Sequence, residues 1–216
     1  MSESITFYTN PMSRGRIVHW LLEEAGAPYE VKLVSFALRE HKAPAYLSVN
    51  PMGKLPAIVH RGTVITEAAA ICTYVADAFP EAKLAPALDD PARGTYLRWM
   101  FFGAGCVEPA MLDQMFSRPA PERPGVLGYG SYPEVINVLD GLLSHSPWLL
   151  GERFSAVDVY VGSQIGWGMM MKTIEPRASF QAYLARQSER PAFKRFIEKG
   201  EALKQQLEKH QASAAS

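Results

Sequence analysis

The spacing of apolar residues predicts that the chain is built from two different parts. In the first part, short runs of β-branched and aromatic residues alternate with stretches in which apolar residues recur every three or four positions. Strands are predicted over residues 5–9 and 29–34 and in a hairpin over residues 57–65, with helices between them and after Glu67. This order, βαβαββα, is typical of a thioredoxin-like α/β domain in which helices cover a sheet.

Beyond about residue 90 the pattern predicts helices and no clear strand. Residues 80–90 contain two prolines and several acidic side chains without periodicity, which indicates a linker over residues 81–90. We therefore expect a thioredoxin-like domain over residues 1–80 and an all-helical domain over residues 91–210.

Three local features are expected in the helical part. Residues 117–133 are rich in proline and glycine and predict a long loop. Ser155 and Asp158 have the spacing of a capping box, which stabilises the start of a helix and carries no chemistry. The tail over residues 211–216 is predicted to fray.

Composition argues against several functions. The chain has 22 basic and 22 acidic residues, a balance that argues against a nucleic-acid-binding surface. It contains no apolar run of about 18 residues, so no membrane span is predicted, and its first residues lack the features of a secretion signal. With only Cys72 and Cys106, no disulfide framework is predicted and we expect a cytoplasmic protein.

The stretch over residues 50–71 offers two anchors for a small, charged ligand that resembles a peptide. Pro56 precedes a strand, where proline is tolerated because it cannot donate to the ladder. If the Leu55–Pro56 bond is cis, the N–H and C=O of Leu55 face outward and can hold another peptide in extended form. Glu67 begins a helix, whose N-terminal N–H groups favour a bound carboxylate.

Residues 39–71, REHKAPAYLSVNPMGKLPAIVHRGTVITEAAAI, resemble the glutathione-site segment of the serine-using, phi-like glutathione transferases. The motifs EHK, N-P-x-G-K-L-P and T-E-x-x-A-I occur in that family's order and spacing, and the helix after Ser155 is similar to the capping-box helix of its second domain. The resemblance implies a bacterial-type, cytosolic glutathione transferase that joins the glutathione thiolate to an apolar electrophile. It also implies glutathione as co-substrate, no metal and a homodimer.

A glutathione-dependent enzyme must turn the thiol of glutathione into the reactive thiolate. Lowering a thiol pKa of about 8.5 by about 2 takes roughly 2.7 kcal/mol. One hydrogen bond to the anion contributes about 1.5–3 kcal/mol, and a helix N-terminus contributes about 0.3–1 kcal/mol. Ser13 begins the first helix and follows Pro11 by two residues, as the catalytic serine does in the resembling family. From the residues alone, an N-capping role is the simpler explanation of Ser13.

Thr9 and Asn10 compete with Ser13 for the catalytic role. Some bacterial glutathione transferases hold the thiol with Thr or Asn in this loop and favour disulfides or peroxides, so a glutathione-dependent peroxidase or disulfide reductase is the alternative activity. Residues 9–16 contain no cysteine, which argues against a glutaredoxin-like mechanism. A non-catalytic binding protein on the same fold is a further alternative.

The resemblance also assigns the residues that hold the tripeptide. His41 and Lys54 match positions that contact its glycine end. Leu55, next to Pro56, supplies its backbone pair to the cysteinyl unit, and Glu67 meets the γ-glutamyl end. Without the resemblance, the charged members of this set would be an ordinary solvated histidine, a lysine and a helix-start glutamate.

One position departs from the resembling family. That family usually has serine where this chain has Ala68, so only a backbone N–H remains for the γ-glutamyl carboxylate. We expect glutathione binding to be weaker by about 1 kcal/mol, the contribution of one hydrogen bond.

The second substrate is expected to bind between the first loop and the helices of the second domain. The candidate residues are Met12, Phe102, Met111 and Met115. Methionine side chains adapt to irregular apolar ligands, although methionines along a helix more often belong to the core.

Overall fold

The computed structural model describes residues 4–119 and 121–214. The chain divides into two compact units, residues 1–82 together with 190–216, and residues 83–189. Among the described residues, no helix has the length and apolar character needed to cross a bilayer.

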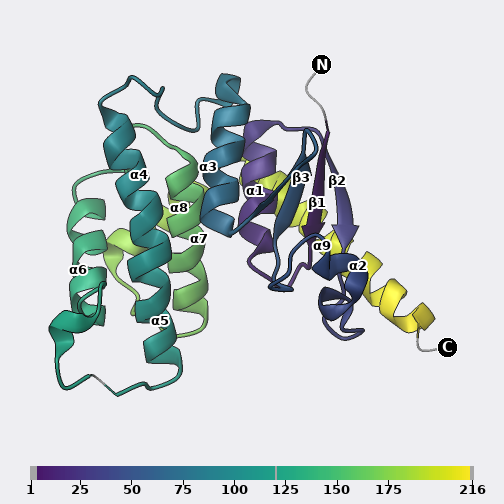
Figure 1. Cartoon of the computed structure of the whole chain (residues 1–216). Coiled ribbons are helices and arrows are strands. Elements are labelled where there is room, and N and C mark those ends of the chain that lie inside the picture. The colour runs from purple at the N-terminus through teal and green to yellow at the C-terminus, as the bar shows by residue number, and fades with distance from the viewer. Residues whose placement is uncertain (1–3, 120, 215–216) are drawn as a thin grey trace. The chain divides into compact units, whose positions relative to one another are not determined.

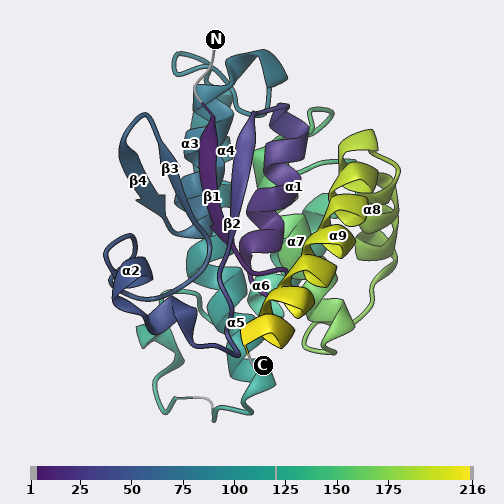
Figure 2. The ribbon, with the colours of Figure 1, turned by 90° about the vertical axis from the view of Figure 1, so that its right-hand side faces the viewer.

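A four-stranded mixed sheet forms the centre of the first unit (Figure 1). Its strands are β1 (Ile5–Thr9), β2 (Tyr29–Leu33), β3 (Ala57–His60) and β4 (Thr63–Thr66). Figure 2 shows them in the order β2-β1-β3-β4, with β1 parallel to β2 and antiparallel to β3, and with β3 and β4 forming a hairpin. The predicted thioredoxin-like fold class is confirmed.

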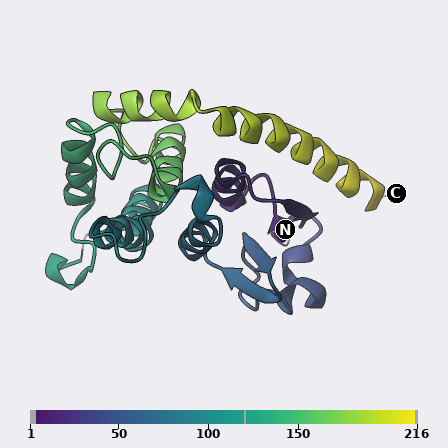
Figure 3. The same ribbon diagram turned by 90° about the horizontal axis from the view of Figure 1, so that it is seen from above.

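Helices cover both faces of this sheet. Helices α1 (Gly15–Ala25) and α3 (Ala68–Ala78) pack side by side (Figure 3), and Phe7 of β1 lies against His19 of α1 with ring centroids 6.1 Å apart. The next residue, Tyr8, points to the opposite face because side chains alternate along a strand. There its ring packs at 5.7 Å on Tyr46 of α2 (Pro44–Leu47), which follows a 3₁₀ turn, η1 (Glu40–Lys42).

The C-terminal helix α9 (Pro191–Ala214) belongs to the first unit, whereas the sequence places it in the helical domain. The physical reason is its packing on α1, where buried Phe196 contacts the rings of His19 and Trp20. The helix continues through Ala214, so the fraying predicted from residue 211 is not seen up to that point. Residues 215–216 lie outside the described residues.

A buried carboxylate also ties α9 to α1. Glu23 accepts hydrogen bonds from the hydroxyl of Tyr29 (2.6 Å), from Nζ of Lys199 (2.6 Å) and from Nε of Arg195 (3.1 Å). Burial alone would raise the pKa of Glu23, but the hydrogen bonds from Lys199, Tyr29 and Arg195 together lower it. Because the tyrosine proton points to Glu23, the ring of His19 donates from Nε2 to the tyrosine oxygen at 3.0 Å.

The second unit is helical. Its helices are α4 (Ala92–Phe102), α5 (Glu108–Met115), α6 (Tyr132–Leu143), α7 (Ala156–Met170) and α8 (Ala178–Ser188). A π-helical segment (Gly103–Val107) joins α4 to α5, and 3₁₀ turns occupy Pro80–Ala82 in the first unit and Pro124–Val126 in the second. Helix α8 was not predicted, although Phe180, Tyr183 and Gln187 are buried at helical spacing.

The predicted capping box starts α7. The Asp158 carboxylate accepts hydrogen bonds from the N–H (2.9 Å) and hydroxyl (3.1 Å) of Ser155. It also accepts from the N–H of Leu149 (2.8 Å) and the hydroxyl of Tyr183 (2.9 Å), so it joins α7 to two other segments of the unit. All of Asp158 is buried, and burial raises its pKa to about 6.

Replacing this carboxylate should therefore cost more than the loss of a helix cap. Asp158→Ala leaves the buried donors of Leu149 and Tyr183 unpaired, and we expect the free energy of unfolding to fall by about 3 kcal/mol. Helix α6 offers a matched control, because Glu134 forms an exposed capping box with Ser131. Glu134→Ala should cost less than about 1 kcal/mol. Urea unfolding of both variants measures the difference, and equal losses would contradict the buried network.

Stability should also depend on the protonation of His19. Burial lowers the pKa of His19 to about 4 from 6.5. Below pH 6.5 the unfolded chain therefore takes up a proton that the folded chain does not, and the stability present above pH 6.5 is lost as the pH falls toward 4. Between pH 7 and pH 5 the loss is about 2 kcal/mol.

The comparison with His19→Gln isolates this contribution, since glutamine donates a hydrogen bond but does not titrate in this range. Urea unfolding at pH 7 and pH 5 should show a loss larger by about 2 kcal/mol in the unchanged protein than in the variant. Parallel losses would mean that His19 is not the titrating group.

Candidate functional site

Strand pairing brings three of the predicted site segments to one end of the sheet. Tyr8 of β1 pairs with Ala57 of β3, which pairs in turn with Thr66 of β4. Extended by one position, the same register puts Thr9, the last residue of β1, beside Pro56, and Pro56 opposite Glu67. Residues that are distant in sequence therefore share this end of the sheet.

The loop that carries His41 joins the same end. The N–H of Val34, directly after β2, donates to the C=O of Thr9 at 2.9 Å. The side-chain amide of Asn10 donates in turn to the C=O of Val34 at 2.9 Å. The start of the His41 loop is thus held against the end of β1.

The backbone of Leu55 is presented at this end, as the sequence predicts for a cis bond. The Leu55–Pro56 peptide bond is cis. The preceding C=O, of Lys54, accepts hydrogen bonds from the hydroxyl of Tyr46 (2.6 Å) and the side-chain amide of Asn50 (2.9 Å). Within the described residues, no hydrogen bond uses the N–H or C=O of Leu55. Both groups can therefore pair with an extended peptide.

Tyr46 and Asn50 are supporting residues that the sequence analysis did not single out. The signal for Asn50 was its place in the turn Asn-Pro-Met-Gly, since its side-chain oxygen accepts from the N–H of Met52 (3.1 Å). Gly53 completes this turn at φ +60°, and a Cβ there would come within 2.6 Å of the C=O of His41. No signal in the sequence pointed to the hydrogen bond of Tyr46.

Ser13 lies just before α1 and is half-buried. Its hydroxyl donates to the C=O of Asn10 at 2.7 Å and accepts from the N–H of Gly15, the first residue of α1, at 3.0 Å. Arg14 holds the N-cap position of α1, so the Ser13 hydroxyl binds the first helical N–H from one residue further back. To donate to a thiolate, the hydroxyl must turn away from Asn10. Such a rotation about one bond is a small change for a serine side chain.

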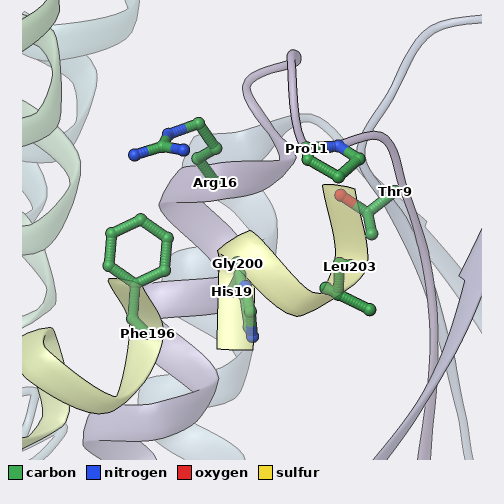
Figure 4. Close-up of a pocket in the computed structure, with 7 residues that line it drawn as sticks. All are labelled: Thr9, Pro11, Arg16, His19, Phe196, Gly200 and Leu203. Carbon is green, nitrogen blue, oxygen red and sulfur yellow. The ribbon is translucent and has the colours of Figure 1, made fainter. Parts of the chain in front are cut away.

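The two competing residues are more deeply buried, with Thr9 and Asn10 each only 2% exposed. The side chain of Asn10 is engaged at both ends, because its oxygen accepts from the N–H of Met12 (2.9 Å) while its nitrogen donates to Val34. Thr9 packs against Gly15 and lines a cavity of about 10 Å³ together with Pro11 and residues of α1 and α9 (Figure 4). That volume is about enough for one water molecule.

Glu67 holds an unusual backbone conformation at the start of α3. Its φ of +66° is rare for a residue with a side chain, and its own side chain is exposed. Helix α3 begins at the next residue, Ala68, so the first N–H groups of the helix point to this end of the sheet. Strained residues of this kind often occur in ligand sites. The first N–H groups and the carboxylate of Glu67 together suit a ligand end that carries both an anion and an ammonium group.

His41 is half-buried in η1, with its ring against that of Phe36 at 5.0 Å. Its Nδ1 is buried without a hydrogen-bond partner among the described residues. A buried polar atom without a partner is uncommon in proteins and indicates a missing one. Lys54 is exposed, and the hydrogen bonds from Tyr46 and Asn50 to its C=O hold its main chain in place.

The residues expected at the second-substrate site differ in how exposed they are to solvent. In the first unit, Met12 is 75% exposed. In the second unit, Phe102 and Met115 are half-buried, whereas Met111 is 2% exposed and its sulfur lies near Gly168 of α7. The environment of Met111 is that of a core methionine.

The cysteine thiols do not resemble reactive ones. Cys72 is buried in α3, and burial raises the pKa of its thiol well above the ordinary range. Burial also raises the pKa of the thiol of Cys106. Both thiols therefore stay protonated at neutral pH, and neither lies in the loop after β1.

Comparison with known proteins gives the family. Residues 3–77 match the family model described as glutathione S-transferase, N-terminal domain. The glutathione S-transferase-like protein gedE of Aspergillus terreus is 30% identical over 169 residues, 71% of this chain and 73% of that protein. The disulfide-bond oxidoreductase YfcG of Escherichia coli is 28% identical over 170 residues, 72% of this chain and 76% of that protein.

A solved structure agrees with these relatives. A glutathione transferase family member from Pseudomonas fluorescens, crystallised with two glutathione molecules bound, superposes with a TM-score of 0.73 at 29% identity, over 91% of this chain and 93% of that chain. The chain therefore belongs to the glutathione S-transferase family, and the enzyme class predicted from the sequence is confirmed.

Proposed function

We propose that this protein binds glutathione at the end of the sheet described above and uses Ser13 to stabilise its thiolate. The observation that carries the proposal is the position of the Ser13 hydroxyl at the start of α1. Its loop follows β1 at the end of the sheet where Tyr8 pairs with Ala57, two residues after Leu55. Of the three candidate side chains in the loop, only that of Ser13 is not fully buried.

The tripeptide would bind in extended form along this end. The N–H and C=O of Leu55 pair with its cysteinyl unit, as a neighbouring strand would. Glu67 and the N–H of Ala68 hold the γ-glutamyl end, and His41 and Lys54 hold the glycine carboxylate. The buried Nδ1 of His41 and the unpaired backbone of Leu55 support this arrangement.

The proposed reaction is nucleophilic substitution, in which the thiolate attacks an apolar electrophile. The sulfur forms a bond to the electrophilic carbon, and the leaving group departs with the electron pair of the bond that breaks. A hydrogen bond from Ser13 and the N-terminus of α1 together offset most of the roughly 2.7 kcal/mol needed for a thiolate at neutral pH. We further propose that Met12, exposed in the loop with Ser13, contacts the electrophile and that the enzyme is a homodimer.

A second candidate function is a glutathione-dependent disulfide reductase or peroxidase that uses Asn10 or Thr9. The relation to an Escherichia coli protein named as a disulfide-bond oxidoreductase favours it. The burial of both side chains and the engaged amide of Asn10 argue against it. In a non-catalytic relative, by contrast, glutathione would bind without any shift of its thiol pKa.

The ultraviolet absorbance of the thiolate, titrated with pH on bound glutathione, tests the assignment. In the unchanged protein we expect a midpoint well below that of free glutathione. Ser13→Ala should move this midpoint up by about 1 to 2 pH units, because one hydrogen bond to the anion is lost. Asn10→Ala should distort the loop and weaken binding while the thiol that does bind keeps its low midpoint.

Two outcomes would contradict the proposal. A midpoint that rises only in Asn10→Ala would transfer the role to Asn10 and favour the disulfide or peroxide chemistry. Glutathione bound with the midpoint of the free thiol would favour a non-catalytic protein.

Ala68→Ser tests the position where this chain has alanine and phi-like glutathione transferases usually have serine. A hydroxyl at the first residue of α3 adds a donor for the γ-glutamyl carboxylate, so glutathione should bind about fivefold more tightly by calorimetry. Ala70→Ser, at an exposed position of the same helix, is the matched control and should leave the affinity unchanged. An unchanged affinity in Ala68→Ser would mean that another group already pairs with that carboxylate.

A further inference from the structure

The last turn of α9 is hydrogen-bonded to the loop that carries His41. Nε2 of His210 lies 2.7 Å from Oε1 of Glu40. The next residue, Gln211, donates from its side-chain amide to the hydroxyl oxygen of Ser35 at 3.0 Å. The C-terminal end of the helix therefore contacts both ends of the short segment 35–40.

Ser35 and Glu40 are the two residues that shape this segment. Ser35 is fully buried, and its N–H donates to Oε2 of Glu40 at 2.6 Å. Its C=O accepts from the N–H of Glu40 at 3.0 Å, and its hydroxyl accepts from the N–H of Leu38 at 3.1 Å. Hydrogen bonds close the segment into a compact loop, and α9 binds the two side chains that close it.

The geometry of this loop decides where the ring of His41 lies. His41 follows Glu40 directly, and its ring packs on Phe36, which follows Ser35 directly. A shift of the loop would move the ring support and the histidine together. At its N-terminal end, the loop begins at Val34, which is hydrogen-bonded to Thr9 and Asn10.

The body of α9 is held independently of its last turn. Arg190, just before the helix, pairs with Glu24 through two hydrogen bonds of 2.7 and 2.8 Å. Arg195 and Lys199 bind the buried carboxylate of Glu23. Changes at residues 210 and 211 should therefore leave the helix in place on α1 and affect only the loop.

We propose that His210 and Gln211 are positioning residues for the glutathione site, acting through Glu40 and Ser35 to hold His41 toward the glycine end of the tripeptide. The role rests on the proposed function, because it presupposes that His41 contacts glutathione. The contribution is one of geometry, since a solvent-exposed polar pair such as His210–Glu40 by itself adds little stability.

The double variant His210→Ala/Gln211→Ala tests the role. Its dissociation constant for glutathione should rise about fivefold, from the loss of an ordered contact at one end of the ligand. The KM for glutathione should rise in parallel, while kcat and the KM for the electrophile stay within about twofold, because the thiolate site is not touched. Amide hydrogen exchange in residues 35–42 should become faster, with α1 and the first half of α9 unchanged.

Three further variants make the test specific. His145→Ala and Gln205→Ala replace an exposed histidine of the second unit and an exposed glutamine of α9, and both should behave like the unchanged protein. His210→Lys keeps a hydrogen-bond donor for Glu40 and should restore most of the affinity lost in His210→Ala. If the double variant loses global stability, the comparison of His210→Ala with His210→Lys decides the question.

The outcomes separate this role from the proposed function. An unchanged protein that binds no glutathione would overturn the proposed function and this role together. Glutathione binding that is the same in the unchanged protein and the folded double variant would overturn the role of α9 alone. Slower turnover without a change in KM would also overturn it.

Discussion

The hydrogen bonds between the end of β1 and Val34 are the constraint on which the candidate site depends. The C=O of Thr9 accepts from the N–H of Val34, and the side chain of Asn10 donates back to the C=O of Val34. Buried backbone groups must be paired, so these bonds determine where the loop with Ser13 and the loop with His41 leave the sheet. The antiparallel register with β3 then adds Leu55, and the site follows from strand pairing more than from any single motif.

The backbone at this end of the sheet is preorganised, and side chains outside the ligand contacts hold it so. Tyr46 and Asn50 both donate to the C=O of Lys54 and so hold the peptide unit that precedes Leu55. Among the described residues, the N–H and C=O of Leu55 itself make no hydrogen bond. Glu67 keeps a positive φ at the start of α3. Such features lower stability by themselves and persist only where the surrounding structure imposes them. In this region the cis bond before Pro56 and the positive φ of Glu67 lie at the same end of the sheet.

Helix α9 connects the core of the first unit to the edge of this region. Its first half is held by apolar packing on α1 and by charges around the buried Glu23, whose burial is offset by three donors. Its last turn reaches Ser35 and Glu40. A tail that composition predicts to fray is ordered through Ala214 because the loop supplies hydrogen-bond partners that no local pattern reveals.

The sequence by itself determined the order of strands and helices in the first unit, the capping box of α7 and the segments that form the candidate site. These features are local: apolar periodicity, a proline before a strand, and a serine with an aspartate three residues later. Tertiary structure decided what local patterns do not encode. It packs α9 with the first unit, and it gives Asp158 the donors of Leu149 and Tyr183 as well as those of Ser155. It also buries Asn10 in a hydrogen bond to Val34 while Ser13 stays half-buried. The physical reason is that a helix stripe or a buried polar group shows that a partner is needed, but only the folded chain shows which residue fills that role.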